Sequence, residues 1–83
     1  MTGTVPTTVV LDNRRTPCAV GLIRAARAIR SLRSGDVLEV WTRDRVAPVE
    51  IPVWVEREGH RIVSQVRVGR WPRGHFVFRV QAR

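Results

Sequence analysis

The sequence predicts a small mixed α/β domain, and three observations support this prediction. The chain has 83 residues, which is enough for one domain with a modest hydrophobic core. Several runs of β-branched and apolar residues are typical of strands. The run from Ala19 to Ser34 instead repeats its apolar residues at the three-and-four spacing of an amphipathic helix. We therefore expect a single domain over residues 1–83, with residues 1–6 disordered.

The first strand and the first helix follow one another near the N-terminus. Thr7 to Leu11 predicts a strand, and Asp12 to Pro17 predicts a polar turn. From Cys18 onward the pattern is helical, with Arg33 in the expected last turn and Gly35 suited to end the helix. The residues expected to form its buried face are Leu22, Ala25, Ala26, Ile29 and Leu32.

The middle of the chain combines a clear strand with an ambiguous segment. Asp36 to Thr42 predicts a second strand, and Arg43 to Pro48 predicts a loop. Val49 to Glu58 fits both a strand period and one side of a helix, and Pro52 weakens both interpretations. Propensity alone favours a strand there, and Gly59 ends the segment in either case.

The C-terminal part predicts two strands joined by a turn. Arg61 to Val68 and His75 to Val80 are the strands, and Gly69 to Gly74 is the turn. The residues expected to share one apolar face are Ile62, Val66, Val68, Phe76, Phe78 and Val80.

The single cysteine, Cys18, is the strongest candidate for chemistry. It stands where the first helix is expected to begin, and Arg14 and Arg15 lie just before it. Helix N-termini expose unpaired N–H groups and carry partial positive charge, which lowers a thiol pKa. Asp12 also flanks the thiol in the sequence. One cysteine forms no internal disulfide, and with two distant histidines we expect no metal site.

The charge points to an anionic partner or to a solvated surface with an arginine bias. The formal net charge is +8, and all fifteen basic residues are arginine. The partner could be nucleic acid or an acidic protein face. No apolar stretch is long enough to span a membrane, and the start lacks the features of a secretory signal, so we expect a cytoplasmic protein. The residues expected to contact partners are Arg24, Arg27, Arg70, Trp71 and Arg73.

Several short motifs, in order, resemble the TusA/SirA-type sulfur-carrier family from Val9 to the C-terminus. The family's Asp-x-Arg-Gly element corresponds to Asp12–Arg15, and the cysteine of its Cys-Pro-x-Pro motif corresponds to Cys18. Further matches are Leu32–Gly35, Leu38–Val40, Arg43–Ala47, Glu50–Trp54 and Gly59–His60.

The resemblance implies a βαβαββ two-layer sandwich, with two helices on a four-stranded mixed sheet. It makes Pro48 to Glu58 the second helix, against the propensity. It also implies a sulfur carrier that needs no cofactor. A cysteine desulfurase or another donor would load Cys18 with persulfide sulfur, and an acceptor protein would receive it for tRNA thiolation, molybdenum-cofactor maturation or sulfur metabolism. Asp12, Arg14 and Arg15 would support the thiolate.

The chain departs from the family pattern around the cysteine. Ala19 and Gly21 stand where the motif has its two prolines, and Arg15 replaces a glycine. In the later loop Arg43 replaces an acid and Arg45 a proline. Two alternatives to a sulfur carrier therefore stay open: a degenerate member acting as an interaction or regulatory subunit, and an arginine-rich nucleic-acid-binding module.

Overall fold

The computed structural model describes residues 6–70 and 72–83, and for Cys18 the backbone alone. Two expectations lie outside these residues. One is the disorder of residues 1–6, of which the structure describes Pro6, and the other is the partner contact of Trp71. The elements are β1 (Thr8–Asn13), α1 (Cys18–Arg30), β2 (Val37–Thr42), α2 (Ala47–Arg57), β3 (Arg61–Val68) and β4 (His75–Gln81). This order confirms the βαβαββ fold.

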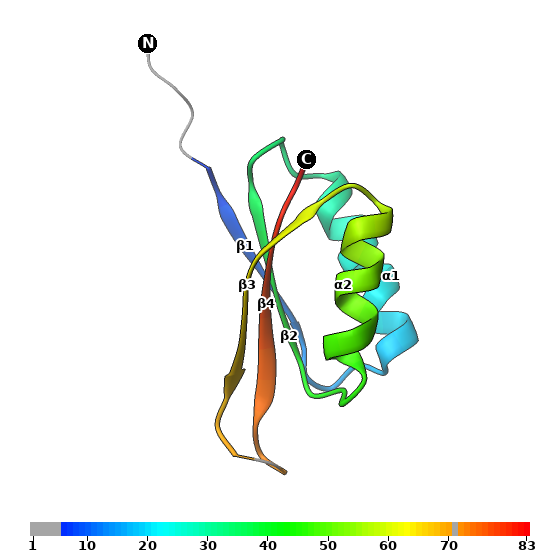
Figure 1. Ribbon diagram of the computed structural model, residues 1–83, viewed down its shortest axis with the longest axis vertical. Coiled ribbons are helices and arrows are strands. Elements are labelled where there is room, and N and C mark those ends of the chain that lie inside the picture. Colours follow the sequence, from blue (N-terminus) through cyan, green and yellow to red (C-terminus); the bar gives the residue numbers. More distant parts are fainter. Residues whose placement is uncertain (1–5, 71) are drawn as a thin grey trace.

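Both helices cover one face of a four-stranded mixed sheet, and the other face is open (Figure 1). The strand order is β1-β2-β4-β3, with β1 and β2 parallel and the other pairs antiparallel. Because β1 and β2 are parallel and each is followed by a helix, both helices begin at the same end of the sheet. The β3–β4 turn lies at that end too (Figure 1). Neither helix among these residues combines the length and the apolar character that a membrane crossing needs.

The core lies between the helices and the two central strands. Alternate residues of β2 and β4 point into it, and Leu38, Phe78 and Val80 are fully buried. Trp54 of α2 is 5% exposed and belongs to the core. The remaining buried apolar residues are Ala25, Ile29, Val40, Ala47, Ile51, Val55 and Ala82. The predicted face of α1 thus points to the core, with Leu22, Ala26 and Leu32 packed at its edge.

The ends of β1 and α1 differ from the prediction. Asp12 and Asn13 were expected in a turn, but they extend β1 by pairing with Trp41 and Thr42 of β2. The helix ends at Arg30 rather than at Ser34, because the chain must turn back toward the sheet. Arg33 therefore lies beyond the end of the helix. The basic residues of the last turn are Arg27 and Arg30.

Gly35 lies within the connection between α1 and β2 and does not end the helix, contrary to the prediction. Its φ of 93° is in the left-handed region that favours glycine. Its N–H donates to the carbonyl of Ala82 over 2.8 Å, which ties this turn to the end of the chain.

The ambiguous segment is the helix α2, so the strand favoured by propensity is wrong and the resemblance is right. Ile51, Trp54 and Val55 are buried on one side, while Val49 and Val53 are 69% and 58% exposed. The alternating valines suggested a strand, but only one helical side packs against the core. Gly59 follows the helix with a φ of 79°, as predicted for a helix-ending glycine.

The prediction that β3 and β4 share one apolar face is wrong for the second half of β3. Ile62 pairs with core-facing Val80, but a bulge lies between Ile62 and Ser64. Beyond it Val66 pairs with Val77, whose side chain is on the open face. One extra residue moves every following side chain to the opposite face. Val66 and Val68 are accordingly 51% and 44% exposed.

Candidate functional site

Cys18 is the first residue of α1, as predicted. Pro17 occupies the N-cap position with extended backbone angles, and no acidic residue lies in the first turn. The first helical hydrogen bond is donated by the N–H of Gly21 to the carbonyl of Pro17 over 2.8 Å. The N–H groups that precede it lack an acceptor within the helix, so this end carries partial positive charge. Such a position favours the thiolate form of a cysteine.

Three hydrogen bonds hold the loop that leads to Cys18. The N–H of Thr16 donates to the carbonyl of Asn13 over 3.0 Å. The Asn13 side-chain Nδ2 donates to the carbonyl of Gly21 over 3.1 Å, and Arg24 Nη1 donates to Thr16 Oγ1 over 2.9 Å. Asn13 is only 3% exposed. The loop is therefore fixed both to the end of β1 and to the first two turns of α1.

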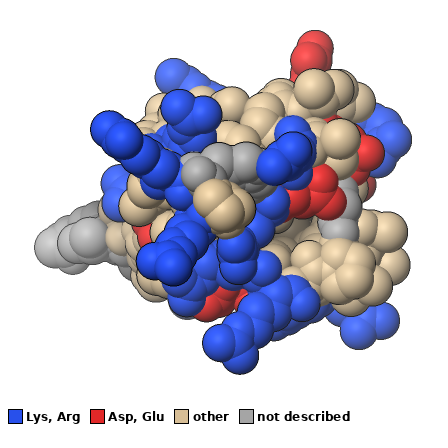
Figure 2. Space-filling view, turned by 90° about the horizontal axis from the view of Figure 1, so that it is seen from below, with Lys and Arg blue, Asp and Glu red and all other residues tan. Residues whose placement is uncertain are grey.

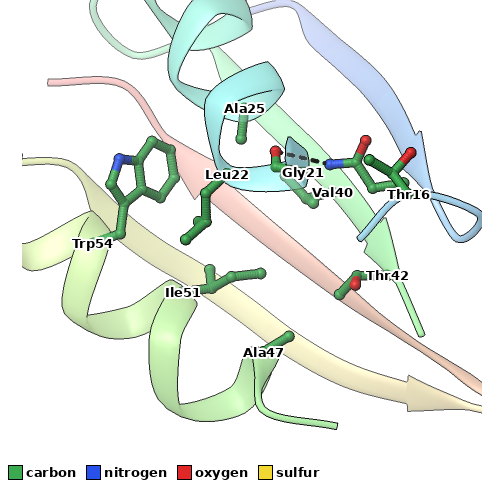
Figure 3. A pocket seen from close by; sticks show the side chains of 10 residues that line it. Thr16, Gly21, Leu22, Ala25, Val40, Thr42, Ala47, Ile51 and Trp54 are labelled. Atoms are coloured by element: carbon green, nitrogen blue, oxygen red, sulfur yellow. Dashed lines mark hydrogen bonds between the residues drawn. The ribbon is translucent and has the colours of Figure 1, made fainter. Parts of the chain in front are cut away.

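Gly21 allows this arrangement by letting Asn13 come close. A Cβ at position 21 would lie 3.2 Å from Asn13 Nδ2, tighter than ordinary contacts. The resemblance places a family proline at this position. The contact between Asn13 and Gly21 thus holds the first turn where the prolines are absent (Figure 3). The sequence did not reveal it, because an asparagine and a glycine eight residues apart form no recognisable motif.

The cavity under this loop is too small for a substrate. Its volume is about 20 Å³, close to the space of one water molecule. Asn13 Oδ1 is buried there without a hydrogen-bond partner. The cavity is lined by Asn13, Thr16, Gly21, Leu22, Ala25, Val40, Thr42, Ala47, Ile51 and Trp54 (Figure 3). This apolar packing supports the loop from below and offers no ligand site.

Asp12 and Arg14 bind each other and extend onto the open face of the sheet. Arg14 Nε and Nη2 donate to the two carboxylate oxygens of Asp12 over 2.9 and 2.8 Å, and the Arg14 N–H donates over 3.0 Å. These bonds lower the pKa of Asp12 to about 2. The Arg14 guanidinium carbon lies 4.9 Å from the centre of the Trp41 ring, a cation–π contact. The two side chains thus form a local salt bridge at the end of β1.

A basic cleft of about 460 Å³ opens at the end of the sheet where both helices begin. Its lining residues come from the end of β1, the β1–α1 loop, the β2–α2 loop and the β3–β4 hairpin: Asp12, Arg14, Arg15, Arg43, Arg73 and His75. Arg43 Nη2 also donates to the carbonyl of Pro72, linking two of these segments. Figure 2 views this end and shows arginine side chains crowding around it.

The cleft unites residues that the sequence analysis assigned to two different roles. Asp12, Arg14 and Arg15 were expected to support the thiolate, and Arg73 was expected to contact a partner. Arg24, Arg27 and Arg70 do not line the cleft, although all three are exposed. Arg43 and His75 were not assigned to this site. The signal for Arg43 was its replacement of a family acid at the end of a strand parallel to the first one.

The part of the chain in residues 6–70 and 72–83 holds no group of three His, Cys, Asp or Glu residues suited to a metal ion. His60 instead helps to close the fold. Its Nδ1 accepts a hydrogen bond from the N–H of Arg83 over 3.2 Å, and burial lowers its pKa.

Comparisons with known proteins find a matching family model and several similar relatives. A family model described as Sulfurtransferase TusA matches residues 9–82. A Bacillus subtilis protein named "Putative sulfur carrier protein YrkI" is 32% identical over 60 residues, which are 72% of this chain and 80% of that protein. A protein of Archaeoglobus fulgidus and one of Thermotoga maritima, both named "Putative sulfur carrier protein", are 33% identical over 56 residues and 32% identical over 62 residues. The aligned residues are 68% and 75% of this chain and 77% and 78% of those proteins.

Proposed function

Because this chain belongs to the TusA sulfurtransferase family, and is a divergent member without the two motif prolines, we propose that it carries sulfur as a persulfide on Cys18. The donor is a cysteine desulfurase or another persulfide-bearing protein, and an acceptor protein receives the sulfur. The observation that carries the proposal is the position of Cys18 at the start of α1 in a chain whose relatives are named as sulfur carriers.

The transfer needs a thiolate and an accessible donor persulfide. The Cys18 thiolate attacks the outer sulfur of the donor persulfide, and a new S–S bond forms. The bond between the two donor sulfurs breaks, and the donor cysteine leaves as a thiolate with the electron pair. In the second transfer the acceptor thiolate attacks the outer sulfur on Cys18 in the same way. No external oxidant or reductant enters either step.

The start of α1 supports both anionic forms of Cys18. The helix dipole favours the thiolate before transfer and the persulfide anion after it. Asn13, Gly21 and Thr16 keep the loop in one arrangement, which reduces the ordering needed when a partner docks. We place this relay in the cytoplasm, where a lone cysteine stays reduced between transfers.

A labelling experiment tests the proposal. The purified protein is incubated with a cysteine desulfurase and L-cysteine labelled with ³⁵S, and then run on a non-reducing gel. We expect label on the wild-type protein that a thiol reductant releases, and none on Cys18→Ser. Circular dichroism of the variant confirms that its fold is intact. Equal label on both proteins would contradict a role for Cys18, and no label on either would favour the interaction-subunit alternative.

A further inference from the structure

The basic cleft has an excess of positive charge that its own residues do not neutralise. Four arginines line it, and among the described lining residues Asp12 is the one acid. Both oxygens of Asp12 are already bonded to Arg14. Among the described lining residues, no second acid is present to pair with the other cationic groups, Arg15, Arg43 and Arg73.

Two of the four arginines are held in place before any partner arrives. Arg14 is fixed by two side-chain bonds to Asp12 and by the ring of Trp41. Arg43 is fixed by its bond to the carbonyl of Pro72. A guanidinium has five N–H donors, so both side chains keep donors for another acceptor. A charged group that is ordered in advance loses less conformational entropy on binding.

The position of the cleft connects it to sulfur transfer. It lies at the end of the sheet where β1 and β2 finish and where α1 begins with Cys18. A protein that exchanges sulfur with Cys18 must approach this end. Arg15 and Arg43 are also two positions at which this chain departs from the family pattern, a glycine and an acid being replaced by arginines. These two arginines of the cleft are therefore features of this chain rather than of the family motif.

We propose that the basic cleft binds a carboxylate-rich segment of the protein that exchanges sulfur with Cys18. This inference rests on the proposed function. Carboxylates accept paired N–H bonds from arginine, and such charge-assisted bonds are among the strongest in proteins. Proteins that bind single-stranded nucleic acid stack its bases on open aromatic rings, and the described ring next to Arg14 is not open in this way. The Trp41 ring is covered by Arg14 and lies 5.8 Å from the His75 ring, centre to centre.

A binding experiment with matched charge variants tests the cleft. The probe is a fluorescein-labelled peptide of eight glutamates, and binding is followed by anisotropy at low salt. The cleft variant is Arg15→Gln/Arg43→Gln/Arg73→Gln. The control variant is Arg30→Gln/Arg57→Gln/Arg61→Gln, whose exposed arginines lie at the opposite end of the helices and of β3. Both variants lose the same charge.

We expect the cleft variant to weaken peptide binding by about tenfold or more, a change of about 1.4 kcal/mol, and the control to weaken it much less. Equal weakening by the two variants would overturn the proposal, because net charge alone would then explain binding. An eight-nucleotide thymidine strand that binds more tightly than the peptide, and loses that binding in the cleft variant, would overturn it in favour of a phosphate site.

The same variants separate this inference from the proposed function. Peptide binding is measured without sulfur, so it does not depend on Cys18. Loading of Cys18 by inorganic polysulfide needs no docked protein, and it is measured on the wild type. A cleft variant that binds the peptide as tightly as the wild type does would overturn the docking site alone, whereas a wild-type protein that never loads would overturn the carrier function alone.

Discussion

Asn13 joins the two parts of the molecule that position Cys18. Its backbone ends β1 by pairing with Thr42, and its buried side chain donates to the carbonyl of Gly21 in the first turn of α1. A carbonyl at the start of a helix already accepts a hydrogen bond from the N–H four residues later. The bond from Asn13 is therefore additional to the helix, and it fixes the loop to the first turn. The cysteine therefore follows a short turn that is fixed at both ends.

Replacing Asn13 by alanine is expected to destabilise the protein by about 1–3 kcal/mol, because a buried hydrogen bond is lost. The effect should be coupled to position 21. In the Asn13→Ala background the crowding of a Cβ by Nδ2 disappears, so Gly21→Ala should stabilise by about 1 kcal/mol through helix propensity. Urea unfolding of the wild type, both single variants and the double variant measures this. Strictly additive free energies would show that the two residues are independent.

The ion pair of Asp12 and Arg14 predicts a pH dependence. Its bonds lower the folded-state pKa of Asp12 from 3.8 to about 2. A lowered carboxyl pKa stabilises the fold above pH 3.8, and this contribution is lost as the pH falls toward 2. Both side chains are more than 40% exposed, so it should amount to less than about 1 kcal/mol. An NMR titration should place the Asp12 midpoint near 2 and move it upward in Arg14→Gln. An unchanged midpoint in the variant would contradict the assigned cause.

At the scale of elements, the sequence predicted regular segments well and interruptions poorly. The face of α1 and the alternation of β2 were visible because burial imposes a fixed period on each. The bulge in β3 was not visible, since Ile62, Val66 and Val68 keep an even spacing and only the pairing with β4 reveals the extra residue. The start of the chain reversal after Arg30 was equally hidden, because Leu32 still packs against the core.

The helix α2 contains an internal proline that we expect to weaken it. Pro52 lies in the interior of the helix, where its missing N–H leaves the Pro48 carbonyl without the usual partner. We expect Pro52→Ala to stabilise the protein by about 1–2 kcal/mol in urea unfolding, after allowance for the larger entropy of its unfolded chain. Pro48→Ala is the control, and it should bring no such gain because a proline in the first turn interrupts no helical bond. A destabilised Pro52→Ala variant would mean that the ring is needed for packing.

At the scale of the whole molecule, the order of the strands brings the residues of the basic cleft to one end of the sheet. Arg15, Arg43 and Arg73 are far apart in the sequence, and they meet because parallel β1 and β2 finish at one edge and the β3–β4 turn lies there as well. The sequence allowed the cysteine and its neighbouring arginines to be singled out. It could not show that Arg43 and His75 join them, because that depends on which strands are neighbours.

One face of the sheet and one end of it have different roles. One face of the sheet is used by the helices to build the core, and the end that they share holds both Cys18 and the basic cleft. The positive charge of the described arginines at that end would attract an acidic partner and steer it toward this end of the molecule. A small domain can thus act as a carrier without an enclosed active site.

The intact mass of the protein during one cycle of sulfur exchange shows whether Cys18 carries sulfur. The protein is loaded by a cysteine desulfurase and L-cysteine, separated from the donor, and then offered a low-molecular-weight acceptor thiol. We expect the wild type to gain one sulfur atom and to lose it to the acceptor, and Cys18→Ser to gain none. A wild-type protein that gains no sulfur, although Cys18 reacts fully with an alkylating reagent, would contradict the account.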